Sequence, residues 1–214
     1  MKDGNLVFVP PNGKQLVLAS ASPRRRELLE QLGLEGFNVE PPGIDERINK
    51  GEIPRDYARR MALGKVASIR QKNIDSFVLG VDTVVACGRR VVDKANTRKQ
   101  AEYCLKTLSG RSHKVISALV VGAPNGKWVE RTVTTNVTFK RLQYLEINNY
   151  LDSAEWEGKA GGYGIQGLAS AFVKKLNGSY TNVVGLPLHE VYTVLLGLGF
   201  HYLKQSGRDR SSGD

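Results

Sequence analysis

The chain has 214 residues, of which 41% are hydrophobic, a share that suits one large globular domain and excludes a fully disordered chain. Its net charge of +10 admits three anionic partners: a nucleic acid, an anionic membrane surface or a small polyanionic ligand. Its two cysteines, Cys87 and Cys104, cannot form a metal cluster alone and do not form a C-x-x-C pair, which favours free thiols in a reducing compartment.

The two ends of the chain differ in composition from its middle. Residues 1–14 are polar and rich in Pro and Gly, which predicts an N-terminal extension and argues against a signal peptide. Residues 204–214 have the composition of a disordered basic tail. We therefore expect one domain over residues 15–203. No apolar run approaches transmembrane length, so a cytoplasmic protein is the expectation.

Strand and helix patterns alternate along this domain. Helically spaced apolar residues predict helices over 23–33, 53–72, 97–108, 142–153 and 188–198, the third of them capped by Asn96 or Thr97. Apolar runs predict a strand at 16–20, a short extended segment at 37–42, a strand at 77–88 that Gly80 could break, and its hairpin return at 88–92.

A long hairpin is predicted over residues 113–142, where APNGK carries the Asn-Gly signal of a tight turn. Residues 171–187 are interpreted as a strand, a turn and a second strand. Because the hairpin forces antiparallel pairs into an otherwise alternating α/β pattern, the sequence predicts an α/β fold with a mixed sheet.

The first candidate site is SASPRRRELL, where a strand passes directly into a helix. Ser22 suits the N-cap and Pro23 the first helical position, which leaves the amides of Arg24 and Arg25 unpaired. A helix N-terminus after a strand binds anions, and arginine donates two hydrogen bonds to a phosphate. The alternative is a capped surface helix whose arginines are solvated.

The second candidate site is GVDTVVACGRRVVDK, in which Asp82 ends an apolar run and Lys94 follows one hairpin later. A carboxylate and a lysine near phosphate-binding arginines suggest activation of water, with or without a divalent cation. The alternative is that Asp82 caps a turn and Lys94 is solvated.

The third candidate site is EWEGKAGGYGIQG, a glycine-rich stretch that contains Lys159, Tyr163 and Gln166. It suits a loop that wraps a ligand, but it matches neither the P-loop nor the dinucleotide-binding fingerprint. The alternative is a flexible surface loop.

In order and spacing, SASPRRRELL, GVDTVV…DK and GKAGGYGIQG…NGSYTNVVGLP resemble the Maf family of nucleoside triphosphate pyrophosphatases, from about Leu16 to Phe200. The resemblance implies the inosine triphosphate pyrophosphatase fold, a mixed, elongated and bent sheet with flanking helices and two lobes around a cleft. It implies hydrolysis of nucleoside triphosphates to a monophosphate and pyrophosphate with Mg²⁺ or Mn²⁺. It also links the chain to septum formation and makes a homodimer an expected assembly.

The resemblance carries roles onto positions of this chain. Ser22, Arg24 and Arg25 match the phosphate-binding segment, Asp82 the general base, and Lys65 and Lys94 the active-site lysines. Asp45 and Glu46 match an acidic pair near the family's active site. We expect Asp45, Glu46 and Asp82 to hold the metal ion.

Arg24, Thr83 and Gln166 match the family branch that prefers dTTP and UTP, rather than the branch with D-Q and E-G that prefers 7-methyl-GTP. The chemistry agrees, because thymine and uracil present an N–H donor between two carbonyl acceptors, and a Gln side chain offers both a donor and an acceptor.

Two positions depart from the family pattern. Ala95 follows Lys94 where a proline is usual, which predicts a less rigid loop. Gly64 precedes Lys65 within a predicted helix and costs about 1 kcal/mol relative to alanine.

Two rival classes remain open. A nucleic-acid binder would explain the net charge, but the basic residues are scattered along the chain with little aromatic interleaving. A non-catalytic nucleotide-binding regulator of cell division would keep the arginines but would not need Asp82. We therefore expect a nucleoside triphosphate as the partner, and neither nucleic acid nor membrane.

Overall fold

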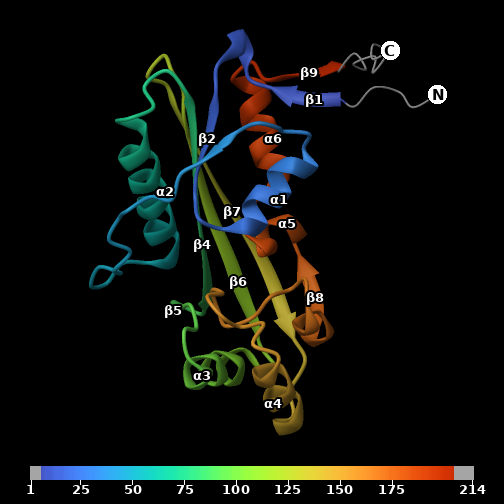
Figure 1. Cartoon of the computed structure of the whole chain (residues 1–214). Helices are drawn as coiled ribbons and strands as arrows, with labels where there is room; N and C mark the ends of the chain where they lie inside the picture. Colours follow the sequence, from blue (N-terminus) through green and yellow to red (C-terminus); the bar gives the residue numbers. More distant parts are fainter. Residues whose placement is uncertain (1–5, 205–214) are drawn as a thin grey trace, which may run out of the picture.

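The computed structural model describes residues 6–204, which form a mixed sheet of seven strands, a separate sheet of two strands, and flanking helices (Figure 1). The strands are β1 (Leu6–Val9), β2 (Leu16–Ala19), β3 (Asn38–Val39), β4 (Phe77–Cys87), β5 (Arg90–Val92), β6 (Ser112–Gly122), β7 (Trp128–Phe139), β8 (Val173–Asn177) and β9 (His201–Lys204). The α-helices are α1 (Pro23–Gln31), α2 (Pro54–Arg70), α3 (Arg98–Leu108), α4 (Tyr144–Asp152), α5 (Tyr180–Val184) and α6 (Leu188–Gly197), with 3₁₀ turns at Pro11–Gly13 and Leu168–Phe172.

The large sheet has the strand order β3-β2-β4-β6-β7-β8, and β5 pairs with the far end of β4. Strand β2 runs parallel to β3 and β4, whereas β4, β6, β7 and β8 pair antiparallel. The mixed sheet expected from the hairpin is therefore present, and Ala123 and Lys127 close its turn with a 2.8 Å backbone hydrogen bond.

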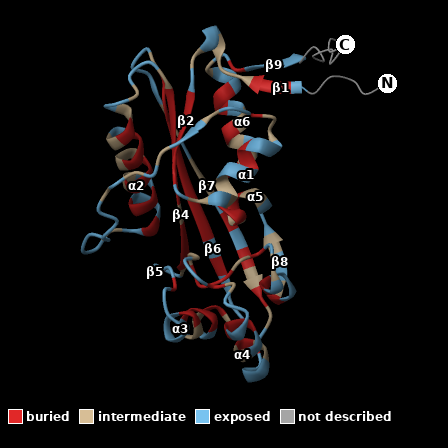
Figure 2. Cartoon of the chain, viewed as in Figure 1, coloured by how far each residue is buried: buried red, intermediate tan, exposed pale blue. Residues whose placement is uncertain are grey.

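Helix α2 covers one face of the sheet, while α1, α5 and α6 lie on the opposite face (Figure 1). Helices α3 and α4 lie at the other end of the long strands, which gives the molecule an upper and a lower part. The central strands are buried along most of their length (Figure 2). The two faces form separate apolar clusters, and the one under α2 includes Val66, Val84 and Ile116.

Close contact between α2 and the sheet depends on Gly80 in β4. A Cβ atom at this position would lie 2.6 Å from Val66 Cγ2 and 2.8 Å from the Ala62 carbonyl oxygen. Strand β4 continues through Gly80 without the break that the sequence allowed. The missing side chain instead lets the helix approach the strand, which places the α2 side chains directly over β4.

The prediction of a second strand within residues 171–187 is wrong, because residues 180–184 form helix α5. The β-branched residues there favour a strand, but Ser179 caps the helix by accepting a hydrogen bond from the Asn182 amide. The buried Asn182 side chain then donates to the Val115 carbonyl and to Thr135 Oγ1. These tertiary hydrogen bonds override the local preference.

Part of the expected N-terminal extension belongs to the folded domain. Strand β1 pairs antiparallel with β9, and the Phe8 ring is buried against Phe200 and Tyr192. The pairing joins two segments that lie almost two hundred residues apart in the sequence, so no local sequence pattern predicts it. The predicted tail beyond Lys204 lies outside the described residues. Within residues 6–204, no helix is both long and apolar enough to cross a bilayer.

Candidate active site

The start of α1 is held differently from the expectation. Pro23 occupies the first turn, as predicted, but the Ser22 side chain does not cap the helix. Ser20 Oγ takes over as the local acceptor, with hydrogen bonds from the Ser22 amide at 3.2 Å and from Arg25 Nη1 at 3.0 Å. Ser22 therefore occupies the N-cap position, as predicted, but its side chain makes no capping hydrogen bond. Its hydroxyl, which lines the pocket described below, is left available to a ligand.

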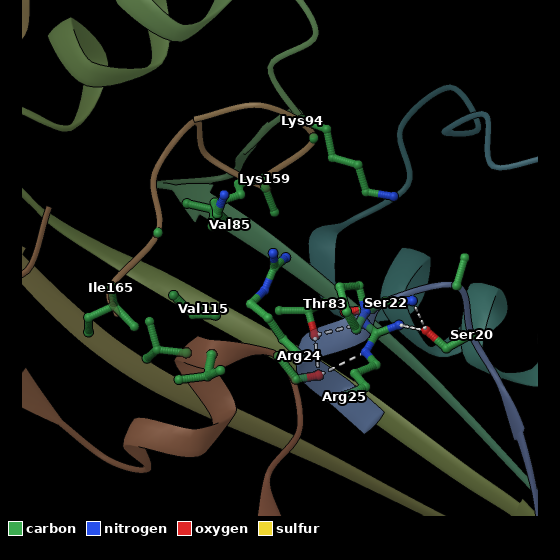
Figure 3. A pocket seen from close by; sticks show the side chains of 18 of the residues that line it. Ser20, Ser22, Arg24, Arg25, Thr83, Val85, Lys94, Val115, Lys159 and Ile165 are labelled. Carbon is green, nitrogen blue, oxygen red and sulfur yellow. Dashed lines mark hydrogen bonds between the residues drawn. The ribbon is translucent and has the colours of Figure 1, made fainter. Parts of the chain in front are cut away.

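The Arg25 side chain ties α1 to the sheet. Its Nε donates to the Gly185 carbonyl at 2.9 Å, and its Nη2 donates to Thr83 Oγ1 at 3.3 Å (Figure 3). Thr83 Oγ1 also lies 2.8 Å from Ser117 Oγ. Arg25 thus uses several of its donors to build the wall of the pocket, and Thr83 belongs to the same network.

A pocket of about 400 Å³ opens where these elements meet. Its walls come from the start of α1, from β4 and β6, from the glycine-rich loop 158–166 and from the segment 183–185. Val85, Val115 and Ile165 supply an apolar side, as Figure 3 shows. A cavity of this size with one apolar wall and convergent polar groups is typical of small-molecule sites.

Two cations point into this pocket, Arg24 from α1 and Lys159 from the glycine-rich loop (Figure 3). Within residues 6–204, neither side chain forms a hydrogen bond or an ion pair. Burial and, after it, the charge of Arg24 lower the pKa of Lys159 from its ordinary value. Two mutually repelling cations without a partner indicate a site for an anion.

A chain of ion pairs lies beside the pocket. Lys65 Nζ on α2 lies 2.6 Å from Asp82 Oδ1 and 2.9 Å from Glu46 Oε1, and Lys94 Nζ lies 3.1 Å from Glu46 Oε2. Asp82 and Lys65 are buried, whereas Lys94 is half exposed. Partial burial opposes ionisation of Glu46, but the hydrogen bonds and charges of the two lysines outweigh it and lower the pKa of this carboxyl to about 2.

A smaller cavity of about 220 Å³ lies beside this chain of ion pairs and shares lining residues with the pocket. Asp82 and Glu46 line it, and it shares Glu46, Thr83, Lys94 and Ala160 with the larger pocket. Because neighbouring strand residues face opposite sides of a sheet, Asp82 faces α2 while Thr83 faces the Arg25 network. The site therefore wraps around one stretch of β4.

The structure separates the two carboxylates of the acidic pair. Asp45 accepts hydrogen bonds from Arg47 at 2.6 to 3.0 Å, is exposed, and lines neither cavity. Glu46 turns inward to the lysines instead. Within the described residues, no three His, Cys, Asp or Glu side chains gather closely enough to hold a metal ion.

The Lys94 loop is attached to the glycine-rich loop. Lys94 and Ala160 form an isolated antiparallel β-bridge. The Ala95 amide donates to the Lys159 carbonyl at 3.3 Å, and the Gly158 amide donates to the Ala95 carbonyl at 3.0 Å. A proline at position 95 would lack the first of these donors. Alanine thus gives up the stiffness of proline and gains a hydrogen bond that joins the two loops.

Gln166 is exposed and lines the pocket at the end of the glycine-rich loop. Of the candidate residues, Asp82 lines the smaller cavity and Asp45 lines neither cavity. The others all line the larger pocket: Ser22, Arg24, Arg25, Glu46, Lys65, Thr83, Lys94 and Gln166. Sequence reasoning placed Lys159 in the loop but gave it no role, because a lysine among glycines does not reveal which way it points.

A family model described as Maf-like protein matches residues 15–198. A dTTP/UTP pyrophosphatase from Paramagnetospirillum magneticum is 50% identical over 185 residues, which cover 86% of this chain and 97% of that protein. One from Mesorhizobium japonicum is 51% identical over 193 residues, which cover 87% and 93%. Among solved structures, a HAM1 protein from Coxiella burnetii aligns with a TM-score of 0.50 at 16% identity, covering 86% of this chain and 99% of that one, which supports the predicted fold.

Proposed function

The chain belongs to the Maf-like protein family, and on that premise we propose that it hydrolyses dTTP and UTP to the nucleoside monophosphate and pyrophosphate. Such an enzyme removes nucleotides from the pool. One observation carries the proposal: a pocket with unpaired cations adjoins a buried carboxylate that a lysine holds in place.

Charge supports a triphosphate as the ligand. A nucleoside triphosphate carries about four negative charges at neutral pH, and phosphate oxygens accept strong hydrogen bonds from cationic side chains. Glu46 is the one carboxylate among the described residues that line the pocket, whereas the cations there are Arg24, Arg25, Lys65, Lys94 and Lys159. The lining therefore keeps net positive charge for the ligand even though Glu46 is paired with Lys65 and Lys94.

We assign the general base to Asp82. Asp82 lines the smaller cavity, which shares Glu46, Thr83, Lys94 and Ala160 with the larger pocket, so it lies beside the space that we assign to the phosphates. Lys65 fixes the orientation of this carboxylate with a 2.6 Å hydrogen bond. Asp82 would accept the proton of a water molecule that attacks the α-phosphorus, while the cations hold the leaving pyrophosphate.

A divalent ion fits this donor set only in part. Mg²⁺ is commonly held by one or two protein carboxylates together with substrate phosphates and water. Glu46 and Asp82 line the same small cavity and can supply such carboxylates, whereas Asp45 is paired with Arg47. Bound there with the substrate, Mg²⁺ or Mn²⁺ would neutralise charge on the phosphates.

We assign recognition of the base to Gln166 at the open end of the pocket. Its amide can donate to a carbonyl and accept from the imide N–H of thymine or uracil. Thr83 lies deeper, where its hydroxyl already bonds Arg25 and Ser117. Its effect on base choice would therefore act largely through the pocket wall.

The resemblance also leads us to propose a cytoplasmic homodimer with a link to septum formation. Light scattering of the purified protein measures its assembly, and cell length after gene deletion measures the link. A monomer, or unchanged septation, would refute the corresponding part without affecting the proposed chemistry.

The test of the main proposal is a panel of nucleoside triphosphates with Mg²⁺, with both products identified. We expect UTP and dTTP to be the best common substrates and to yield monophosphate and pyrophosphate. Diphosphate and orthophosphate as products would refute cleavage between the α and β phosphates. Binding without turnover would favour a regulator, and preferential binding of nucleic acid would favour the other rival class.

A further inference from the structure

The loop that carries Gln166 is packed against the start of its own segment. Gln166 stands between Gly164 and Gly167, and the amide of Gly167 donates to the Gly164 carbonyl at 3.2 Å. Both glycines face side chains from residues 155–159. A Cβ at position 164 would lie 2.8 Å from Lys159 Cε, and one at position 167 would lie 2.1 Å from Glu155 Oε2.

Gly167 serves to make space for a neighbouring side chain. Its φ is −107°, outside the left-handed region that favours glycine. A side chain at this position would meet the Glu155 carboxylate, whose carbon and two oxygens would all lie within 2.7 Å of the added Cβ atom. The absence of a side chain at Gly167 therefore allows Glu155 to lie against the loop backbone.

Glu155 uses this space to hold the loop. Its Oε2 accepts a 2.8 Å hydrogen bond from the Leu168 amide, two residues after Gln166. Within the described residues the Glu155 side chain forms no ion pair, and the Leu168 amide is its one hydrogen-bond partner. Hydrogen bonds from backbone amides to carboxylates are among the stronger ones in proteins.

We propose that Glu155 is a positioning residue that determines how Gln166 is presented to the nucleotide base, and hence which base is accepted. This inference rests on the proposed function. Glu155 holds the backbone after Gln166, at the Leu168 amide, and the hydrogen bond from Gly167 to Gly164 closes the turn around Gln166. Gln166 is thereby fixed at both ends although its own side chain is exposed.

An electrostatic role is the competing explanation. Glu155 and Glu157 both favour the charged form of Lys159, against burial and Arg24, which lower its pKa. Removing Glu155 could therefore weaken phosphate binding instead of base recognition. Glu157 provides the matched control, because it is exposed, carries the same charge two residues away, and its side chain has no hydrogen bond within residues 6–204.

The experiment compares E155A, E155D, E155Q and E157A with the wild type. We measure kcat and KM for UTP and for 7-methyl-GTP, and the inhibition constant of inorganic tripolyphosphate, which has phosphates but no base. E155Q keeps an oxygen acceptor of the same reach without the charge. E155D keeps the charge but withdraws the acceptor by one methylene group.

We expect E155A and E155D to raise KM for UTP on the order of 10-fold, as a displaced substrate contact does, and to narrow the preference for UTP over 7-methyl-GTP. E157A should stay close to the wild type, and E155Q should lie between the wild type and E155A, because it keeps an oxygen acceptor but loses the charge that strengthens the hydrogen bond. The inhibition constant of tripolyphosphate should change less than about twofold in all four variants. Hydrogen exchange at the Leu168 amide should accelerate most in E155A and E155D.

The inference is overturned if E155D keeps the wild-type preference, or if tripolyphosphate binding weakens together with UTP binding. It is also overturned if E155Q and E157A lose as much as E155A, since charge would then be the cause. Should E155A fail to fold, E155D and E155Q still decide the question. A wild-type protein that hydrolyses no nucleoside triphosphate would refute the proposed function itself, a result that no Glu155 variant can imitate.

Discussion

The ammonium group of Lys65 lies 2.6 Å from Asp82 Oδ1, and each side chain is only 6% exposed. The pair joins helix α2 to strand β4 at the level where Gly80 allows the two elements to approach closely. Glu46 accepts a second bond from the same ammonium at 2.9 Å. One buried lysine thus orients Asp82 and Glu46, two of the acidic residues that line the smaller cavity.

Removing the charge of Asp82 should abolish most of the rate. We expect Asp82→Asn to lower kcat at least ~100-fold, the usual effect of losing a general base, while nucleotide still binds. Pyrophosphate release at saturating Mg²⁺ measures kcat, and equilibrium titration measures binding. Asp75→Asn is the control, because Asp75 is 84% exposed and lines neither cavity. Near-wild-type turnover in Asp82→Asn would remove Asp82 from the mechanism.

Breaking the buried pair from the lysine side should cost stability. Lys65→Met leaves the Asp82 carboxylate buried without its main partner, which typically costs about 3–5 kcal/mol in the free energy of unfolding. Adding Asp82→Asn removes that stranded charge, so the double variant should be more stable than Lys65→Met alone. Urea unfolding of the three variants measures the coupling. Additive effects would mean that the two side chains do not depend on each other.

Arg24 and Lys159 should act on the phosphates. We expect Arg24→Met and Lys159→Met each to raise the inhibition constant of inorganic tripolyphosphate on the order of 10-fold, because each removes a cation without a protein partner. The losses should shrink as salt rises. Arg26→Met is the matched control, since Arg26 is exposed and paired with Glu30. Equal effects at positions 24 and 26 would indicate general surface attraction only.

Gln166 should read the base. We expect Gln166→Glu to cost on the order of 1–3 kcal/mol in kcat/KM for UTP, because a carboxylate meets a base carbonyl with repulsion. Relative activity on 7-methyl-GTP should rise, and more so when Thr83→Gln is added. The ratio of kcat/KM for the two nucleotides decides the matter. If both variants leave it unchanged, these residues do not contribute to base choice.

His113 should make the fold sensitive to acid. Burial lowers the pKa of His113 to about 4, and its Nε2 lies 2.8 Å from Tyr163 Oη, which lines the pocket. The unfolded chain binds a proton near pH 6.5 and the folded chain does not until about pH 4, so stability should fall as the pH drops through this window. The ceiling of this effect is about 3 kcal/mol.

Urea unfolding at several pH values measures the dependence on His113. His113→Gln should flatten the curve between these two pH values, since glutamine does not titrate. His189→Gln should leave it intact, because His189 is not buried. A curve that keeps its slope in His113→Gln would assign the acid sensitivity to other groups.

Interactions between residues close together in the sequence allowed several helix starts and turns to be predicted. Pro23 starts α1, Thr97 and Gln100 form the capping box of α3, and the Asn-Gly turn closes the hairpin of β6 and β7. Each of these features depends on residues within a few positions of one another, so the sequence alone specifies it. The same holds for the three motifs that identified the family.

Tertiary structure decided what depends on distant partners. Ser22 is the N-cap residue of α1, but its side chain makes no capping hydrogen bond, and the Ser22 amide and Arg25 both donate to Ser20 Oγ. Residues 180–184 form a helix in which Asn182 is anchored to β6 and β7. Asp45 and Glu46 are neighbours in sequence, yet Asp45 pairs with Arg47 in solvent. Glu46 instead pairs with two lysines from separate parts of the chain. The direction of Lys159 and the hold of Glu155 on the Gln166 loop follow the same rule, because a side chain's role is set by the atoms that the whole fold brings within reach of it.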